Sequence, residues 1–227
     1  FSSDGSYLVV SAGRVVLFSF NNSTGAVTAL DNYDTNGDTN DAKFSPDDNY
    51  IAVAKGFSDS DSVKLLDHTT RGSLSLSATY NTGGREALGI GWSPDGDYVV
   101  VGADATGGIT LLDHTTAGSL SLADTFSNND TRGVAYRPDG NQIACVSGSS
   151  EVLFLDSTTA GSISSLTTYS TSSQTYGPAW TKDSKYVAAG INASPYLVVL
   201  EESSSSTYTC SSSYGGSRAQ AMAFSPN

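Results

Sequence analysis

The chain has 227 residues, of which 38% are hydrophobic and 15% are charged. This length is ample for a buried core, and we treat residues 1–227 as a single domain. The 23 Asp and Glu residues outnumber the 11 Lys and Arg residues and give a net charge of -12, so the chain repels phosphate backbones and anionic lipid surfaces. The sequence contains no run of 18 or more apolar residues. These features exclude nucleic acid as an expected partner and membrane insertion as an expected mode of attachment.

An aromatic residue followed by a turn sequence recurs along the chain at intervals of 43, 48, 44, 44 and 44 residues. The aromatic positions are Phe1, Phe44, Trp92, Tyr136, Trp180 and Phe224. In the clearest copy, Trp92 is followed by Ser-Pro-Asp-Gly, in which Pro presets φ for a β-turn while Asp and Gly suit its remaining positions. The period matches the about 40–45 residues of a four-stranded propeller blade.

Each repeat contains four segments with the composition of β-strands. The first strands, at residues 88–92, 133–136, 177–180 and 221–224, carry small residues on one face, which suits a position near a crowded axis. The second strands lie at residues 7–13, 50–56, 98–102, 142–148 and 186–190. The third, at 14–20, 63–67, 109–113, 152–156 and 196–201, are largely apolar and suit burial between blades. The fourth, at 26–33, 73–80, 119–126, 162–169 and 205–214, alternate as half-exposed edges do.

These segments predict an all-β fold, a five-bladed β-propeller of four-stranded antiparallel blades. The repeats span residues 1–43, 44–91, 92–135, 136–179 and 180–227. Because the chain starts after a first strand and ends after supplying one, we expect residues 221–224 to pair beside residues 7–13 and to close the ring. Two alternatives remain open. The terminal strand could complete the next molecule in a head-to-tail polymer, or the chain could be part of a larger ring.

The aromatic-Ser-Pro-Asp-Gly corner and the hydrophobic strand after it resemble those of WD-repeat propellers, over essentially the whole chain. The third strands end in Leu-Asp pairs where that family has Trp-Asp, and the Gly-His pair that opens a WD repeat is missing. The Gly-Ser-Leu-Ser-Leu runs, the Thr-Gly-Gly before Arg85 and the Trp92 corner are also similar to lactonase-like and surface-layer propellers. The resemblance implies a propeller. A lactonase would imply more blades, and acidic metal or substrate residues that the sequence does not place.

Three arginines, Arg85, Arg132 and Arg218, each precede a first strand, so we expect them at one mouth of the central channel. Guanidinium groups there, together with Tyr176, could bind an anion or a glycan. The alternative is that they only neutralise nearby carboxylates on an acidic protein.

A loop with oxygen-bearing side chains at alternate positions is the candidate metal site: Asp34, Asn36, Asp38 and Asn40. Calcium prefers such oxygen ligands, but the glycine is not where an EF-hand has it and no bidentate Glu follows. We therefore favour a solvated acidic loop over a calcium site, and we expect no other cofactor.

Four Asn-X-Ser/Thr sequons lie in expected loops, at Asn21, Asn22, Asn129 and Asn192. Such triplets also arise by chance in a Ser/Thr-rich chain. With the scarcity of Lys, Met and Cys, they favour a glycosylated protein outside the cell or on a cell or virion surface.

No Ser-His-Asp set, metal pair or phosphate-binding glycine loop is recognisable in the sequence, and Glu86 is the one glutamate near the expected channel mouth. We therefore expect a non-enzymatic, extracellular or particle-surface subunit that interacts with protein partners or with itself. The alternative is a lectin-like or anion-binding propeller. A lactonase-like enzyme is the third hypothesis and is disfavoured.

Overall fold

The computed structural model describes residues 1–56, 61–104, 108–204, 207–217 and 219–224. This part of the chain forms five antiparallel sheets, which we number as blades 1 to 5 in chain order. Blade 1 has three strands: β1 (Tyr7–Ser11), β2 (Val15–Phe20) and β3 (Val27–Tyr33). Blade 2 has β4 (Thr39–Phe44), β5 (Tyr50–Lys55), β6 (Val63–Asp67) and β7 (Ser75–Tyr80).

Blades 3 to 5 each have four strands in the same order. Blade 3 has β8 (Ala87–Trp92), β9 (Tyr98–Ala103), β10 (Ile109–Asp113) and β11 (Ser121–Phe126). Blade 4 has β12 (Thr131–Tyr136), β13 (Gln142–Ser147), β14 (Glu151–Asp156) and β15 (Ser164–Ser170). Blade 5 has β16 (Thr175–Trp180), β17 (Tyr186–Ile191), β18 (Leu197–Ser204) and β19 (Thr207–Tyr214).

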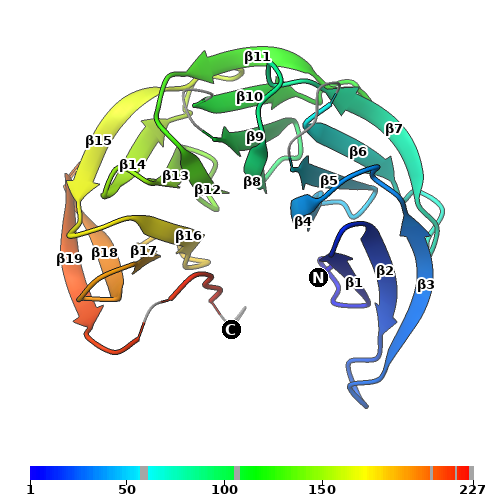
Figure 1. Cartoon of the computed structure of the whole chain (residues 1–227), viewed down its shortest axis with the longest axis horizontal. Helices are drawn as coiled ribbons and strands as arrows, with labels where there is room; N and C mark the ends of the chain where they lie inside the picture. The colour runs from blue at the N-terminus through cyan, green and yellow to red at the C-terminus, as the bar shows by residue number, and fades with distance from the viewer. Residues whose placement is uncertain (57–60, 105–107, 205–206, 218, 225–227) are drawn as a thin grey trace.

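The blades follow one another in an arc, as Figure 1 shows, with β4, β8, β12 and β16 nearest the centre and β3, β7, β11, β15 and β19 on the outer rim. Each sheet from blade 2 onward begins with the strand that ends at the aromatic residue of the repeat, so sheet and repeat boundaries are offset by one strand. The prediction of an all-β propeller of four-stranded antiparallel blades is confirmed. In the described ranges, no helix is long and apolar enough to cross a membrane.

The hydrophobic core lies between neighbouring blades. Ala52 and Leu65 of blade 2 share one buried cluster with Val99 and Leu112 of blade 3, and all four side chains are fully buried. Strands β5 and β13 are buried along their whole length, because a neighbouring blade covers each of their faces. This double burial explains why the middle strands have few polar positions.

The repeated turn sequence has a defined role at each blade corner. Ser93 Oγ donates a hydrogen bond to Asp95 Oδ1 and accepts one from Tyr98 N–H at 2.9 Å. The same contacts recur at the corners that begin at Ser45 and Thr181. In blades 2, 3 and 5 the corner therefore ties the inner strand to the second strand, which is why the motif repeats.

The expected closing strand is not seen in the described residues. Residues 219–224 are not in a strand, and among the described strands β1 pairs with β2 alone. A Cβ placed on Gly177 in β16 would lie 2.9 Å from Ala221 Cα, so the terminal segment packs on blade 5. The terminal segment thus lies beside β16 in the same way that β16 lies beside β12. Blades 1 and 5 stand at opposite ends of the arc, since the four packing steps between five blades do not complete a turn (Figure 1).

Glycines let successive inner strands come close together. A Cβ added at Gly89 in β8 would lie 2.9 Å from Gly133 Cα, and one added at Gly133 in β12 would lie 2.8 Å from Pro178 Cδ. Real Cβ atoms do not pack at these distances, so either substitution would push two blades apart.

We predict that Gly89→Ala lowers the free energy of unfolding by about 1–3 kcal/mol, because the added methyl group meets backbone rather than a side chain that can move. Urea unfolding measures this change. The matched control is Gly215→Ala, where the new Cβ would lie 3.7 Å from Ser194 Oγ in ordinary contact. Equal changes in the two variants would contradict the role of close approach.

Carboxylates that accept hydrogen bonds at the blade edges are stabilised in their charged form. The Thr115 hydroxyl, followed by the Thr115 N–H, lowers the pKa of Asp113. The backbone N–H of Ile163, in blade 4, lowers the pKa of Asp124 in blade 3. Both folded-state pKa values lie below the unfolded value of about 3.9, so this stabilisation is complete above that pH and is lost as pH falls through the folded values.

We predict that the midpoint of thermal unfolding falls on acidification from about pH 5 to about pH 3, and falls less in an Asp113→Asn, Asp124→Asn double variant. The variant has lost the two groups whose protonation is linked to unfolding. Differential scanning calorimetry across this range tests the prediction. An identical acid dependence in the variant and the parent chain would refute it.

Candidate functional site

A polar cavity opens at the axis where the inner strands begin. We call it the channel-mouth cavity. Its volume is about 620 Å³, and its lining residues are Asn40, Glu86, Leu88, Asp104, Asp130, Arg132, Tyr176 and Gln220. They come from blades 2 to 5 and from the C-terminal segment, so the site exists only because the blades converge here.

The repeat spacing explains how these residues meet. Four of them occupy one position in successive repeats, 44 residues apart: Leu88, Arg132, Tyr176 and Gln220. Glu86 and Asp130 share a second position, just before β8 and β12. Asp104 joins them because its N–H donates to the Glu86 carbonyl at 3.0 Å, which extends the pairing of β8 with β9. Equivalent positions of successive repeats thus bring different side chains into the same cavity.

Arg132 is held in a fixed position in this cavity. Its Nε and Nη2 both donate to Asp130 Oδ2, at 2.9 and 2.7 Å. The Cζ atom lies 5.9 Å from the centre of the Tyr176 ring, within the range of a cation–π contact. The hydrogen bond that Arg132 donates to Asp130 raises the pKa of Arg132, so the guanidinium stays charged at every physiological pH.

Glu86 is one of the three carboxylates that line this cavity, and it has hydrogen-bonding capacity to spare. Its Oε1 accepts a hydrogen bond from Asn40 Nδ2 at 2.9 Å, and the same amide nitrogen lies 2.8 Å from the Ala87 carbonyl oxygen. The Glu86 N–H donates to Asp104 Oδ1 at 3.2 Å. Among the described residues, none donates to Glu86 Oε2, so this oxygen is available to a water molecule or a hydroxyl group in the cavity.

The site is acidic, since three carboxylates face one arginine that is already paired. A second cavity of about 360 Å³ continues along the inner strands and shares Arg132 and Tyr176 with the first. Lys43 lines this second cavity, where its Nζ donates to the Ile90 carbonyl at 2.8 Å. The arrangement can hold a polar, uncharged molecule through carboxylate acceptors and a cationic donor.

Two of the four residues proposed to bind a ligand at the channel mouth line this cavity together, Arg132 and Tyr176. Arg85 is not among its lining residues. Arg218 lies outside the described residues. Ligand binding by these residues stays a prediction. The sequence reading missed Asp104 and Asp130, although the spacing of 44 residues between Glu86 and Asp130 was a signal that could have revealed the second.

The residues of the candidate calcium loop have other partners. Asp34 Oδ1 accepts a hydrogen bond from Asn36 N–H at 2.9 Å, as in an Asx turn. The Asp38 carbonyl accepts the N–H of Gly56, and the Asn40 amide is directed to Glu86. In the part of the chain that the structure covers, no group of three acidic, His or Cys side chains could hold a metal ion.

The four sequon asparagines, Asn21, Asn22, Asn129 and Asn192, are all exposed and lie outside the strands. Asn21 Oδ1 accepts hydrogen bonds from Ser23 N–H and Thr24 N–H, which order the turn between β2 and β3. Glycosylation at these residues, and a location outside the cell or on a surface, stay predictions.

Several solved structures with the same shape are described as lactonases. A protein from Bacteroides uniformis, provisionally assigned as a 6-phosphogluconolactonase, superimposes with a TM-score of 0.78 at 17% identity, over 96% of this chain and 71% of its own. A provisionally assigned 6-phosphogluconolactonase from Bacteroides fragilis gives 0.78 at 16%, over 96% and 70%. The periplasmic gluconolactonase of Pseudomonas aeruginosa gives 0.79 at 16%, over 94% and 70%. At this identity the likeness shows the fold.

These structures overturn the prediction of a non-enzymatic structural and interaction subunit. That prediction was drawn from the lack of a recognisable catalytic motif in the sequence. In a propeller, however, the residues of a central site come from several repeats, so a local motif is not required. The expectations of a structural protein, of a head-to-tail polymer and of a glycosylated protein likewise find no support in these structures.

No curated protein sequence matches the chain. A family model does match, over residues 10–152, and its description is Eukaryotic translation initiation factor eIF2A. The matched region is more than half of the 227 residues and runs from blade 1 into blade 4. The blades of this chain form a β-propeller similar in shape to those of the lactonases. By the match of the family model, the chain belongs to the eIF2A family.

Proposed function

We propose that the chain hydrolyses a sugar-acid lactone of the gluconolactone type, bound in the channel-mouth cavity. The observation that carries this proposal is the meeting of Glu86, with one oxygen available, and the charged Arg132 in one polar cavity of about 620 Å³. The propellers of the same shape that are described as lactonases support the choice of reaction.

The reaction needs two groups that this cavity supplies. Water adds to the lactone carbonyl carbon, the ring C–O bond breaks, and the ring oxygen takes up a proton to give the open hydroxy acid. Glu86 would accept the proton of the attacking water as a general base. Arg132 would stabilise the negative charge that develops on the carbonyl oxygen, as a preorganised cation does. Asp130 and Tyr176 would keep the guanidinium in place.

The charge of the cavity selects among lactones. Glu86, Asp104 and Asp130 oppose one Arg132, whose charge Asp130 already balances. A phosphate ester on the substrate would add negative charge to an acidic site on a chain of net charge -12. We therefore assign an uncharged sugar lactone, rather than its phosphorylated form, as the preferred substrate.

The family description names translation initiation, a process that takes place on RNA. The net charge of -12 disfavours direct contact between this chain and RNA, so the cavity carries our proposal instead.

We also propose that the blades are divergent WD-like repeats. The Asp that ends the third strand supports this proposal, because Asp67 and Asp113 each accept two hydrogen bonds from the Thr two residues later.

We predict that the chain accelerates the hydrolysis of glucono-1,5-lactone above the spontaneous rate, measured with a pH indicator near neutral pH. Glu86→Gln should lower kcat by about 100-fold or more, because it removes the general base. Arg132→Gln should lower kcat by a similar factor, because it removes the charge at the developing oxyanion. The 6-phosphorylated lactone should be hydrolysed with a lower kcat/KM.

The matched control is Arg14→Gln, which removes one charge of the same kind at an exposed residue between β1 and β2, outside the cavity, and should leave kcat and the unfolding midpoint unchanged. Circular dichroism establishes that each variant is folded. A parent chain that gives only the spontaneous rate refutes the proposal, and so does full activity in folded Glu86→Gln.

A further inference from the structure

One structural position recurs at the end of the third strand of every blade. In each blade two neighbouring strands pair in the same register. The pairs are Tyr7 of β1 with Ser19 of β2, Tyr50 of β5 with Asp67 of β6, Tyr98 of β9 with Asp113 of β10, Gln142 of β13 with Asp156 of β14, and Tyr186 of β17 with Glu201 of β18. The next residue in each blade is therefore equivalent: Phe20, His68, His114, Ser157 and Glu202. We call this position the slot residue. It lies between the corner of its own blade and the preceding blade.

An aromatic ring fills the slot in blades 1 to 3. The His114 ring lies edge-on to Tyr50 at 4.9 Å and to Trp92 at 5.1 Å, between ring centres. His68 lies between Tyr7 and Phe44 in the same way. Both histidines are buried. In blade 1, Phe20 meets the ring of Phe1 at 5.2 Å.

The two nitrogens of His114 have opposite roles. Nδ1 lies 3.1 Å from the Gly96 carbonyl oxygen, which can only accept a hydrogen bond. Nε2 lies 3.3 Å from the Gly118 N–H, which can only donate. These two partners suit the tautomer with its proton on Nδ1, and the ring links the corner of its blade to the loop after its third strand.

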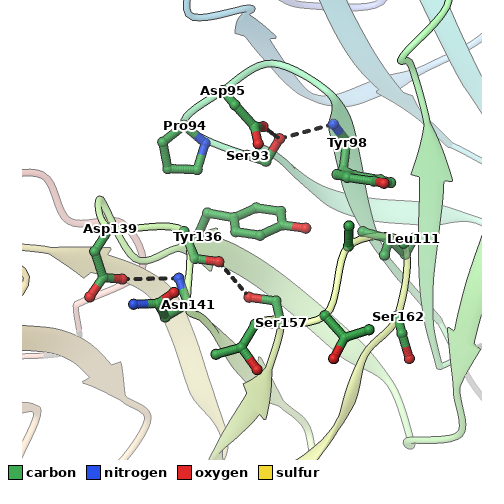
Figure 2. Close-up of a pocket in the computed structure, with 15 residues that line it drawn as sticks. Ser93, Pro94, Asp95, Tyr98, Leu111, Tyr136, Asp139, Asn141, Ser157 and Ser162 are labelled. Carbon is green, nitrogen blue, oxygen red and sulfur yellow. Dashed lines mark hydrogen bonds between the residues drawn. The ribbon is translucent and has the colours of Figure 1, made fainter.

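In blade 4 the slot holds Ser157, and the ring is missing while its surroundings remain. Ser157 Oγ donates to the Gly140 carbonyl at 2.8 Å, the contact that His114 makes through Nδ1. The walls are Tyr98 and Tyr136, in the places of Tyr50 and Trp92. Figure 2 shows the Tyr136 ring facing Ser157 across a cavity of about 220 Å³.

The N–H of Gly161, equivalent to that of Gly118, has lost its acceptor. Within the described residues, no atom accepts a hydrogen bond from Gly161 N–H. Gly161 itself lines the cavity. In blade 5, by contrast, Glu202 occupies the slot and is bound by Arg137 and Gln142. The slot of blade 4 is thus the one in this series with neither a ring nor an ion pair.

We propose that the cavity between blades 3 and 4 binds a small neutral nitrogen heteroaromatic ring of the imidazole class. Such a ring would pack edge-on against Tyr98 and Tyr136, as the histidine rings pack in blades 2 and 3. Its unprotonated nitrogen would accept the Gly161 N–H, and its N–H would donate to Ser157 Oγ, whose proton is directed to Gly140. The volume is below the about 300 Å³ of pockets for drug-sized ligands, which fits a single ring.

This site is separate from the channel-mouth cavity, since the two share no lining residue. The proposal therefore does not depend on the lactone reaction. Burial, followed by the charge of Asp95, raises the pKa of Tyr136 well above its usual value, so this wall of the cavity stays uncharged.

We predict that imidazole, added at about pH 8.5 where it is neutral, shifts the amide resonance of Gly161 saturably in the NMR spectrum of the whole chain. Pyrrole, which has the N–H but no acceptor nitrogen, should bind about 10-fold more weakly, because one hydrogen bond is lost. Ser157→His should abolish the shift and raise the unfolding midpoint, because the slot then holds its own ring.

The reciprocal variant tests the same chemistry in blade 3. His114→Ser should lower the unfolding midpoint, and imidazole should raise the midpoint of this variant more than that of the His114→Phe control, whose slot stays filled. The proposal is overturned if imidazole gives no saturable shift at Gly161. It is also overturned if pyrrole binds as tightly, if the shift persists in folded Ser157→His, or if imidazole fails to restore His114→Ser.

Discussion

The close approach of successive inner strands is the constraint on which the rest of the structure depends. Gly89, Gly133 and Gly177 each leave no room for a Cβ against the backbone or proline ring of the following segment. This contact recurs every 44 residues in blades 3 to 5, where it limits how far one inner strand lies from the next. It also brings the first residues of the inner strands together around the axis. The polar cavity thus depends on the small size of the inner-strand glycines next to it, which let the strands converge.

Function in such a fold comes from differences between repeats that are otherwise alike. At one inner-strand position the chain carries Leu88, Arg132, Tyr176 and Gln220, and these side chains meet at the channel mouth. At the slot it carries rings in three blades, Ser157 in blade 4 and Glu202 in blade 5. In both places the common residues build the frame, and the residue that departs from the repeat provides the chemistry.

The sequence was sufficient for the blades because the corner contacts are local: Ser93, Asp95 and Tyr98 lie within six residues and bond to one another. It was insufficient for the closure, since the angle between blades depends on packing between residues about 44 positions apart, and the terminal segment remains against Gly177. The sequence did predict Arg132 and Tyr176 at the channel mouth, because each lies at the start of an inner strand. Asp104 did not, because it joins the site through the β8–β9 pairing.

The arc also distributes stability unevenly along the chain. Val53 in blade 2 is fully buried, because blade 1 covers it, whereas the equivalent Val10 in blade 1 is 39% exposed. Blades 2 to 4 are therefore packed between two blades, whereas blades 1 and 5 each have one neighbouring blade, and in blade 5 the C-terminal segment covers the inner strands on the other side. Glu86 and Arg132 stand on the doubly covered blades, while Tyr176 belongs to a terminal one. Regions with fewer packing contacts open first in local unfolding. We therefore expect blade 5, which carries Tyr176, to open before the blades that carry Glu86 and Arg132, so the groups proposed to do the chemistry stay in place when blade 5 opens.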